Sequence, residues 1–236
     1  MEQPTGTQAG SQTLSRGIRL LEILASADRN LSIADLANAL GVHRSVAYRL
    51  LRTLEHHDLV TRDHAGQFAL GAGLAALTSG VARNLQQAAL PVLNEIANDL
   101  GMTCLLAVLQ GSGDVVTLVS AAPRQSVAVS YRPGHRHPIS SGGPGKAILL
   151  GMPESAWPAD LSDEVRAELV ETRVRGYAHS HDEVVPSLRS VAVPLILSGQ
   201  PPASIAVIHV SFDRTEAEIA ERLKLGAQSV ARAYGA

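Results

Sequence analysis

The most distinctive chemical pattern in the sequence is a row of hydrogen-bond donors between residues 44 and 52. Ser45, Tyr48, Arg49 and Arg52 recur at i, i+3, i+4 and i+7, and Arg44 precedes them. In a helix, this spacing gathers the donors on one face. Such a face can donate hydrogen bonds to guanine O6 and N7 in the major groove of duplex DNA, or to phosphate oxygens.

Position along this helix separates the contacts that we expect with bases from those with phosphate. Base edges are reached best from the start of a helix that enters the groove. We therefore predict base contacts for Arg44, Ser45, Tyr48 and Arg49. Arg52 lies further along the helix and is expected to contact phosphate.

Two other segments of the same region offer contacts with the DNA backbone. Amide groups at the start of a second helix, near Ser32 and Ile33, can bind a phosphate. Arg62 and His64 lie in a short hairpin and suit the backbone or the flanking minor groove. The alternative interpretation is a solvated surface, which is the commoner meaning of a single exposed arginine.

Three helices must position these donors. Apolar residues at helical spacing predict helices over residues 15–26, 33–40 and 43–56. Ser32 and Asp35 resemble a capping box at the start of the second helix, with Asp in the place of Glu. The third helix has an apolar side opposite its donors, and this side is expected to pack on the other two helices.

A glycine-containing turn and a hairpin complete the module. Gly41 suits the left-handed residue that ends the second helix. Short alternating runs over 59–62 and 67–70, joined by a turn that includes Gly66, predict a β-hairpin wing. Together these elements predict a winged helix-turn-helix, and their order favours DNA binding over the solvated surface.

The rest of the chain forms a linker and a larger module. We divide the sequence into a disordered tail over 1–12, a DNA-binding domain over 13–71, a linker helix over 72–84 and a second domain over 85–236. The second domain mixes helical and strand patterns, so its class is α/β, in detail α+β. Pro91 predicts a kink or a helix start. The expected strands are 103–110, 114–121, 126–131, 191–197 and 203–212, and the expected helices are 85–100, 162–174 and 215–234.

A glycine-rich stretch in the second domain is a candidate binding site. Gly142 and Gly143 allow backbone amides to approach an anion, and Lys146 can add positive charge at a helix start. We predict a loop over 140–145. The alternative to a binding site is a tight strand-to-helix turn there, with Lys146 paired to a carboxylate or solvated. Ala147 stands where a P-loop has Ser or Thr, so nucleotide hydrolysis is not supported.

A titratable cluster over 176–183 invites a metal-binding or catalytic interpretation. This cluster can coordinate a metal or transfer protons, and its members are His179, His181, Asp182 and Glu183. No recognisable nucleophile accompanies them, so a polar loop over the mouth of a pocket is favoured. The histidines near the first module lack a spacing that closes a metal site, and we expect no metal or cofactor. These histidines are His43, His56, His57 and His64.

Composition limits the class of protein. The 236 residues are 45% hydrophobic and 18% charged, which is typical of a globular chain. A net charge of −2 argues against a chain-wide polycation, and 3% aromatic residues argue against platforms of stacked rings. The single cysteine, Cys104, excludes an internal disulfide and indicates a reducing compartment, so we expect the cytoplasm. No stretch of 18 apolar residues occurs, so no membrane segment is expected.

Short motifs in both modules follow one another in a fixed order. They are Leu14-Ser15-Arg16-Gly17-Ile18, Leu20-Leu21-Glu22-Ile23-Leu24, Leu36-Ala37, Gly41, Arg44-Ser45, Tyr48-Arg49-Leu50-Leu51, Leu54, Phe68-Ala69-Leu70-Gly71, Gly145-Lys146-Ala147-Ile148-Leu149, Gly176-Tyr177-Ala178, Glu183 and Ser190-Val191-Ala192-Val193-Pro194. In this order they resemble IclR-type bacterial transcriptional regulators over nearly the whole chain. The resemblance implies a winged-helix domain, a linker helix used in dimerisation and a GAF-like domain that binds a small metabolite, often a carboxylic or aromatic acid. It also implies a homodimer or a dimer of dimers on a palindromic operator.

The resemblance further implies where the effector is held, and there the sequence departs from the family. Relatives often have His-Ala-Thr-Ala-Ser before the Gly-Lys-Ala motif, whereas residues 140–144 here are Ser-Ser-Gly-Gly-Pro. Polar side chains are therefore lost, and the expected pocket is partly apolar. The implied effector residues are Ser141, Gly142, Gly143, Asp182, Ser190, Ala206 and Ile208, with Ser180 as the alternative to Asp182.

The leading hypothesis is a sequence-specific DNA-binding transcriptional regulator whose operator affinity changes when a metabolite binds the second domain. One alternative is a small-molecule enzyme with an active site around residues 140–146 and 179–183. A third is a DNA-binding protein that responds to no effector. The family that the sequence resembles includes both repressors and activators.

Overall fold

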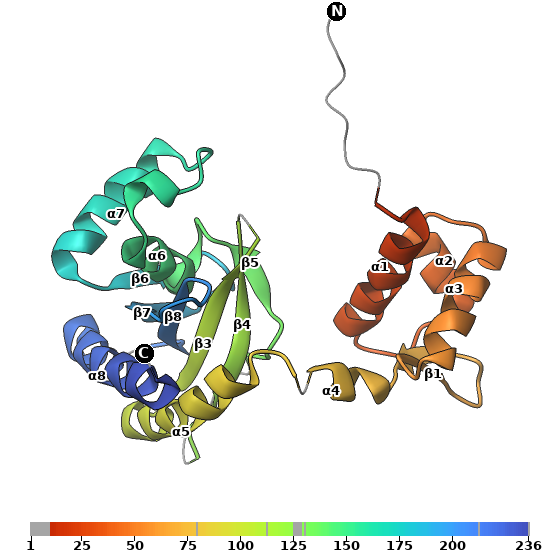
Figure 1. The fold of residues 1–236 in the computed structure, drawn as a ribbon, viewed down its shortest axis with the longest axis horizontal. Coiled ribbons are helices and arrows are strands. Elements are labelled where there is room, and N and C mark those ends of the chain that lie inside the picture. Colours follow the sequence, from red (N-terminus) through yellow and green to blue (C-terminus); the bar gives the residue numbers. More distant parts are fainter. Residues whose placement is uncertain are drawn as a thin grey trace, which may run out of the picture. The chain divides into compact units, whose positions relative to one another are not determined.

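Helices and a small sheet form the first of the two units into which the chain divides in the computed structural model (Figure 1). The structure describes residues 10–78, 80–111, 113–124, 129, 131–211 and 213–235. The first unit is Met1–Val81. Its elements are α1 (Gln12–Ser26), α2 (Ile33–Leu40), α3 (Arg44–His56), β1 (Val60–Arg62), β2 (Phe68–Leu70) and α4 (Gly73–Thr78).

Capping residues set the ends of the helices in this unit. The Ser11 side chain accepts a hydrogen bond from the Leu14 amide at 3.3 Å, so α1 begins earlier than its apolar pattern predicted. Ser32 and Asp35 form the predicted capping box of α2. Gly41 ends α2 with a φ of 68°, as predicted for a left-handed residue.

Leucines from α1, α2 and α3 pack with the base of the wing to form the core of the first unit. β1 and β2 pair antiparallel, with Thr61 opposite Ala69. The fold thereby confirms the predicted winged helix-turn-helix. The buried side chains of this core are Leu20, Leu24, Leu36, Leu50, Leu51, Val60 and Phe68.

The second unit, Ala82–Ala236, is built on one six-stranded antiparallel sheet. The strand order is β5-β4-β3-β8-β7-β6, so the C-terminal strand β8 lies at the centre beside β3. The elements are α5 (Arg83–Leu100), β3 (Thr103–Gln110), β4 (Asp114–Ala121), β5 (Arg136–Pro138), α6 (Gly142–Gly151), a 3-10 turn (Glu154–Ala156), α7 (Asp163–Arg175), β6 (Ala178–His181), β7 (Arg189–Leu195), β8 (Ala203–His209) and α8 (Glu216–Tyr234).

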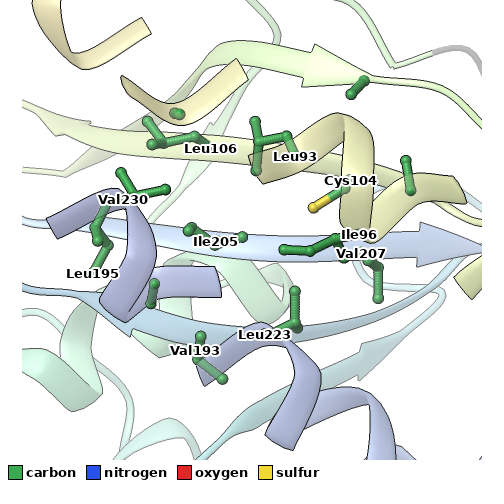
Figure 2. Close-up of a cluster of buried hydrophobic side chains, with 14 of the residues drawn as sticks. Leu93, Ile96, Cys104, Leu106, Val193, Leu195, Ile205, Val207, Leu223 and Val230 are labelled. Atoms are coloured by element: carbon green, nitrogen blue, oxygen red, sulfur yellow. The ribbon is translucent and has the colours of Figure 1, made fainter. Parts of the chain in front are cut away.

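Both faces of this sheet are buried, one against α5 and α8 and the other against α6, with α7 packed on α6 (Figure 1). Successive residues of a strand point to opposite faces, so Leu106 of β3 faces α5 and α8 while Leu105 faces α6. Figure 2 shows the first of these cores, where Leu93 of α5 and Leu223 of α8 meet strand residues including the buried Cys104. Burial raises the pKa of the Cys104 thiol, so the thiol stays protonated and unreactive at neutral pH.

The glycine-rich stretch is a helix, where the sequence predicted a loop over 140–145. α6 begins at Gly142, and its first eight residues are buried. A Cβ atom on Gly143 would lie 2.3 Å from the Ser190 Oγ, and one on Gly145 would lie 2.3 Å from the Ile139 carbonyl oxygen. These glycines therefore serve close packing of α6 against the sheet, and the loop prediction was wrong because it took them as signs of backbone freedom.

Three further expectations for the second unit require correction. Half of the polar loop predicted over 176–183 is strand β6, which pairs with β7. The short strand β5 was not predicted, because three residues give too little alternation to recognise. α5 starts at Arg83 and runs through Pro91, so Pro91 does not start the helix. Pro91 lies on the exposed side of α5, where water can solvate the carbonyl group that its missing N–H leaves unpaired.

Several expectations concern residues outside the described ranges. Most of the strand predicted over 126–131 and residues 1–9 of the predicted tail fall there. Gln12, assigned to the tail, belongs to α1. Among the residues that the structure does describe, no helix is both long and apolar enough to cross a membrane.

Candidate nucleic-acid interface and ligand cavity

α3 has one buried face and one exposed face, as its sequence pattern predicted. Its buried residues are Ala47, Leu50 and Leu51, which pack into the core of the first unit. The exposed face carries all five predicted donors, and Tyr48 retains 45% of its accessible surface. These donors are Arg44, Ser45, Tyr48, Arg49 and Arg52.

The charges on this face are not neutralised within the described part of the chain. None of Arg44, Arg49 and Arg52 forms a salt bridge with another described residue. The face therefore presents guanidinium groups to solvent beside a hydroxyl and a phenol. This combination can bind phosphates and base edges, because each guanidinium can donate two parallel hydrogen bonds.

The start of α2 offers less to a phosphate than the sequence suggested. The Ser32 amide and hydroxyl both donate to Asp35 Oδ2, at 3.0 and 2.9 Å, and the Asp35 amide donates to Ser32 Oγ at 3.2 Å. These hydrogen bonds hold the pKa of Asp35 below its ordinary value, so a carboxylate already occupies this helix start. A phosphate contact near Ser32 would have to come from the next amides, such as that of Ile33.

The wing presents two basic side chains on an anchored hairpin. Arg62 and His64 are both exposed, and the Arg62 guanidinium lies 5.5 Å from the centre of the Phe68 ring. Leu31, just before α2, forms backbone hydrogen bonds with Phe68 in both directions, at 3.0 and 2.8 Å. The hairpin is thus tied to the helix-turn-helix at its base.

A small cavity in the second unit contains some of the predicted effector residues. It measures about 20 Å³ and includes Ser190 and Ile208, together with Ser180, the alternative to Asp182. This volume suits about one water molecule. The sequence did not single out the other lining residues, Tyr131, His137, Pro144, Val184, Val185, Leu188 and Arg189.

The backbone amides that were expected to bind an external anion instead donate hydrogen bonds to other residues of the chain. The Gly142 amide donates to Glu183 Oε2 at 2.8 Å, and the Gly143 amide donates to Ser190 Oγ at 3.0 Å. The Ser190 hydroxyl also forms a hydrogen bond with Ser180 at 2.7 Å. The start of α6 therefore binds the carboxylate of Glu183, an anion supplied by the chain itself.

Lys146 is buried between two carboxylates, as the alternative interpretation predicted. Only 3% of its surface is exposed, and its Nζ donates to Glu168 Oε1 at 2.7 Å and to Glu183 Oε1 at 2.6 Å. One ammonium group thus faces two carboxylates. Together these three side chains carry a net charge of about −1 when all of them are ionised. Its partners lie 22 and 37 residues away, so the sequence alone did not identify them.

Other predicted effector residues lie away from this cavity. Asp182 is exposed and accepts a hydrogen bond from the Ser187 amide. Ala206 is fully buried in the core between the sheet and α6. The Ser141 amide donates to the Pro138 carbonyl oxygen at 3.1 Å.

The titratable cluster over 176–183 does not converge on a catalytic arrangement. His179 Nδ1 lies 3.4 Å from Glu216 Oε2, whereas Glu183 turns toward Lys146. His181 Nε2 lies 3.5 Å from Asp182 Oδ2, and both side chains are exposed. Within the described residues, no three His, Cys, Asp or Glu side chains are arranged to hold a metal ion.

Burial sets the protonation states around the cavity. Burial lowers the pKa of His137 below its ordinary value, although hydrogen bonds to backbone and nearby acids oppose this effect. Burial likewise raises the pKa of Tyr131 to about 12. At neutral pH the cavity is therefore lined by a neutral imidazole and a neutral phenol. Arg189, whose side chain also contacts Glu216 at 3.3 Å, is the cation among its lining residues.

Two family models match this chain and together cover most of it. Residues 13–64 match the IclR helix-turn-helix domain, and residues 78–232 match the bacterial transcriptional regulator IclR C-terminal domain. The first match contains α1 except for its first residue, together with α2, α3 and β1, and the second contains the whole six-stranded sheet. Each unit therefore matches a separate model.

Individual proteins resemble the chain along its length. The transcriptional repressor IclR of Escherichia coli is 26% identical over 95% of this chain and 90% of its own length. A solved IclR-type transcriptional regulator from Alicyclobacillus acidocaldarius has a TM-score of 0.82 at 26% identity, covering 96% of this chain and all of that chain. An IclR homologue from Microbacterium hydrocarbonoxydans, solved with 4-hydroxybenzoate, has a TM-score of 0.77 at 21% identity, covering 94% and 99%.

Proposed function

Because the chain belongs to the IclR family of bacterial transcriptional regulators, we propose that α3 enters the major groove of operator DNA and that a small acid bound in the second unit changes this binding. The observation that carries the proposal is the exposed, unneutralised donor face of α3 opposite its buried leucines. The enzyme alternative is set aside, since the family and the matched relatives are transcriptional regulators.

Each exposed donor has a proposed role at the DNA. Arg44, Ser45, Tyr48 and Arg49 contact base edges, because they occupy the first two turns of α3. Arg52, in the third turn, contacts phosphate.

We propose that contacts with the DNA backbone flank the major-groove contacts of α3. Arg62 and His64 contact the DNA backbone or minor groove from the wing. Near Ser32, the amides at the start of α2 contact phosphate. A regulator of this kind acts in the cytoplasm, at the nucleoid.

We further propose that two copies of the chain bind one operator. Two recognition helices on one side of a duplex need a spacing of about 34 Å, which a dimer provides. Large apolar side chains in the first unit support a covered surface, because Leu14 and Ile18 of α1 and Leu77 of α4 are about half exposed or more. A homodimer or a dimer of dimers would cover them.

The effector proposal concerns the start of α6. The homologue with bound 4-hydroxybenzoate supports an aromatic or other carboxylic acid as the ligand class. We propose that the ligand carboxylate replaces that of Glu183 at the Gly142 amide and the hydroxyl of Ser190 at the Gly143 amide, beside Ser190 and Ile208. Because the cavity measures about 20 Å³, the segment over 182–188 has to move before such a ligand can enter.

The proposed effector residues also include three that do not line the cavity. Ser141, Asp182 and Ala206 lie outside the lining of the cavity. An opened segment over 182–188 would bring Asp182 with it, whereas Ala206 would contact the ligand only after α6 shifts.

Selection of genomic DNA tests the DNA-binding proposal. Sheared DNA from the genome that encodes this chain is incubated with the purified protein, and bound fragments are sequenced. We expect a small set of enriched fragments that share an inverted repeat. Enrichment of no fragment over random genomic DNA would contradict the proposal.

The enriched fragments then test the effector proposal. DNA affinity is measured with and without 4-hydroxybenzoate, benzoate and succinate, alongside thermal unfolding of the protein. We expect at least one acid to stabilise the protein and to change DNA affinity by roughly 5- to 150-fold, the usual range of allosteric coupling. A protein that binds the fragments and responds to none of the acids would favour the alternative without an effector.

A further inference from the structure

The carboxylate of Asp63 closes the turn of the wing. Its Oδ1 accepts a hydrogen bond from the Gln67 amide at 2.9 Å. The Asp63 amide donates to the Gln67 carbonyl oxygen at 2.9 Å, and the Gly66 amide donates to the Asp63 carbonyl oxygen at 3.0 Å. Asp63 thus takes part in the hydrogen bonds that define the path of the chain between β1 and β2.

The second oxygen of the same carboxylate ties the wing to the helix-turn-helix. Asp63 Oδ2 accepts a hydrogen bond from Asn30 Nδ2 at 2.9 Å, across 33 residues of sequence. Asn30 immediately precedes Leu31, whose backbone pairs with Phe68 at the base of the wing. The wing is therefore held at two points, one through backbone at its base and one through side chains near its turn.

The position of this carboxylate is unfavourable for DNA binding on electrostatic grounds alone. Asp63 lies between Arg62 and His64, the two side chains proposed to contact the DNA backbone. The hydrogen bond from Asn30 holds the pKa of Asp63 below its ordinary value, so the carboxylate is charged at neutral pH. A negative charge beside phosphates repels them and reduces affinity unless it has another role.

We propose that Asp63, held by Asn30, is a positioning residue that fixes the turn of the wing so that Arg62 and His64 reach the DNA backbone. The inference rests on the proposed DNA-binding function. Both oxygens of the carboxylate are engaged in fixing the hairpin, which accounts for an acid at this site. The gain from two ordered contacts with the DNA backbone outweighs the repulsion from one carboxylate.

Asn30→Ala is the primary test, because it breaks the side-chain tie and changes no charge. DNA affinity is measured by fluorescence anisotropy on an enriched genomic fragment over a series of salt concentrations. We expect weaker binding and a plot of log K against log salt that is shallower by about 1, as the phosphate contact of Arg62 is lost. Hydroxyl-radical footprints should lose protection only at the flanks, where the wing binds.

Asp63→Ala tests the positioning role by whether it weakens or tightens DNA binding. If the carboxylate only repelled phosphate, its removal would tighten binding. A positioning role predicts weaker binding, despite the loss of a negative charge. Tighter binding by Asp63→Ala would therefore overturn the inference.

An exchange of the two side chains separates positioning from a general loss of stability. In the double variant Asn30→Asp, Asp63→Asn, the amide and the carboxylate trade places, so the net charge and the hydrogen bond between them are kept. The new amide oxygen at position 63 can still accept from the Gln67 amide. We expect the double variant to recover affinity and salt dependence that each single variant loses. Failure of the exchange to recover either quantity would contradict the inference, even if Asn30→Ala proved poorly folded.

Two further measurements distinguish a failure of the inference about the wing from a failure of the proposed DNA-binding function. Hydrogen exchange without DNA should show faster exchange of the Gln67 amide in Asn30→Ala, at an unchanged midpoint of thermal unfolding. Arg49→Ala reports on the proposed function itself, since it acts at bases and not through the wing. If Arg49→Ala weakens binding and Asn30→Ala does not, the inference is wrong and the proposed function stands. If the unaltered chain binds no fragment, both are wrong.

Discussion

At the scale of single residues, the charge balance at the start of α6 depends on one lysine. Lys146 is almost fully buried, whereas Glu168 and Glu183 retain about a third of their side-chain exposure. Glu183 also accepts the Gly142 amide, so it joins the ion pair to the start of the helix. Removal of the ammonium would leave two carboxylates close together with no countercharge.

We predict that Lys146→Met lowers the free energy of unfolding by about 3 kcal/mol, at the low end of the range for breaking a buried ion pair because both carboxylates keep some solvent. Lys224→Met is the matched control. Lys224 pairs with Glu221 at 2.8 Å on the surface, and loss of that pair should cost about 0–1 kcal/mol. Urea unfolding of both variants measures the difference, and equal losses would contradict the prediction.

Single residues also differ in how far the sequence could identify them. The donors of α3 were predictable, because exposure along a helix follows from the spacing of its leucines. His137 and Tyr131 were not, since they reach the cavity from β5 and from an irregular segment. Likewise, the Glu183 carboxylate meets Gly142 across 41 residues, a contact that no local pattern encodes.

At the scale of elements, α6 shows how glycine can serve packing instead of flexibility. The helix lies against β7, and the space beside Gly143 is filled by Ser190. Gly151 at the other end is similar, because a Cβ there would lie 2.9 Å from Pro194 Cβ. Small residues on this face let the helix backbone approach the sheet closely enough for the Gly143 amide to reach Ser190.

Gly143→Ala should therefore destabilise the second unit, although alanine is the better helix former. Its Cβ would lie 2.3 Å from Ser190 Oγ, and we expect a loss of about 1–3 kcal/mol in the free energy of unfolding. Gly17→Ala in α1 is the control, because nothing lies within 4 Å of a Cβ there. That variant should gain about 0.5–1 kcal/mol. Thermal and urea unfolding measure the change in the free energy of unfolding for both variants. A stabilised Gly143→Ala would refute the packing argument.

Elements with local signals were predictable, whereas those shaped by distant contacts were not. The capping box of α2 and the left-handed Gly41 are encoded within a few residues, and both occur as predicted. The strands β3 and β4 were predicted with their observed bounds, because runs of eight mostly apolar residues between glycine-containing turns give a clear signal. The first turn of α6, over residues 142–145, was missed, because the packing role of its glycines depends on the distant Ser190 and on Ile139.

At the scale of the whole molecule, overall composition conceals the feature on which function depends. The chain carries 20 basic and 22 acidic residues, so its net charge gives no sign of an affinity for DNA. The exposed face of α3 nevertheless holds three arginines without a salt-bridge partner among the described residues. A local arrangement of charge, and not the total, makes this chain suited to bind a nucleic acid.

The most direct test of this account is a titration of one enriched genomic fragment with three proteins: the unaltered chain, Arg49→Ala and Arg232→Ala. Arg232 is an exposed arginine of α8 in the second unit and serves as the matched control. If Arg49 makes a bidentate base contact, its loss should weaken binding by about 1–3 kcal/mol, or roughly 5- to 150-fold, while Arg232→Ala binds as the unaltered chain does. Equal affinity of all three proteins for the fragment would contradict the assignment of α3 as the helix that reads DNA.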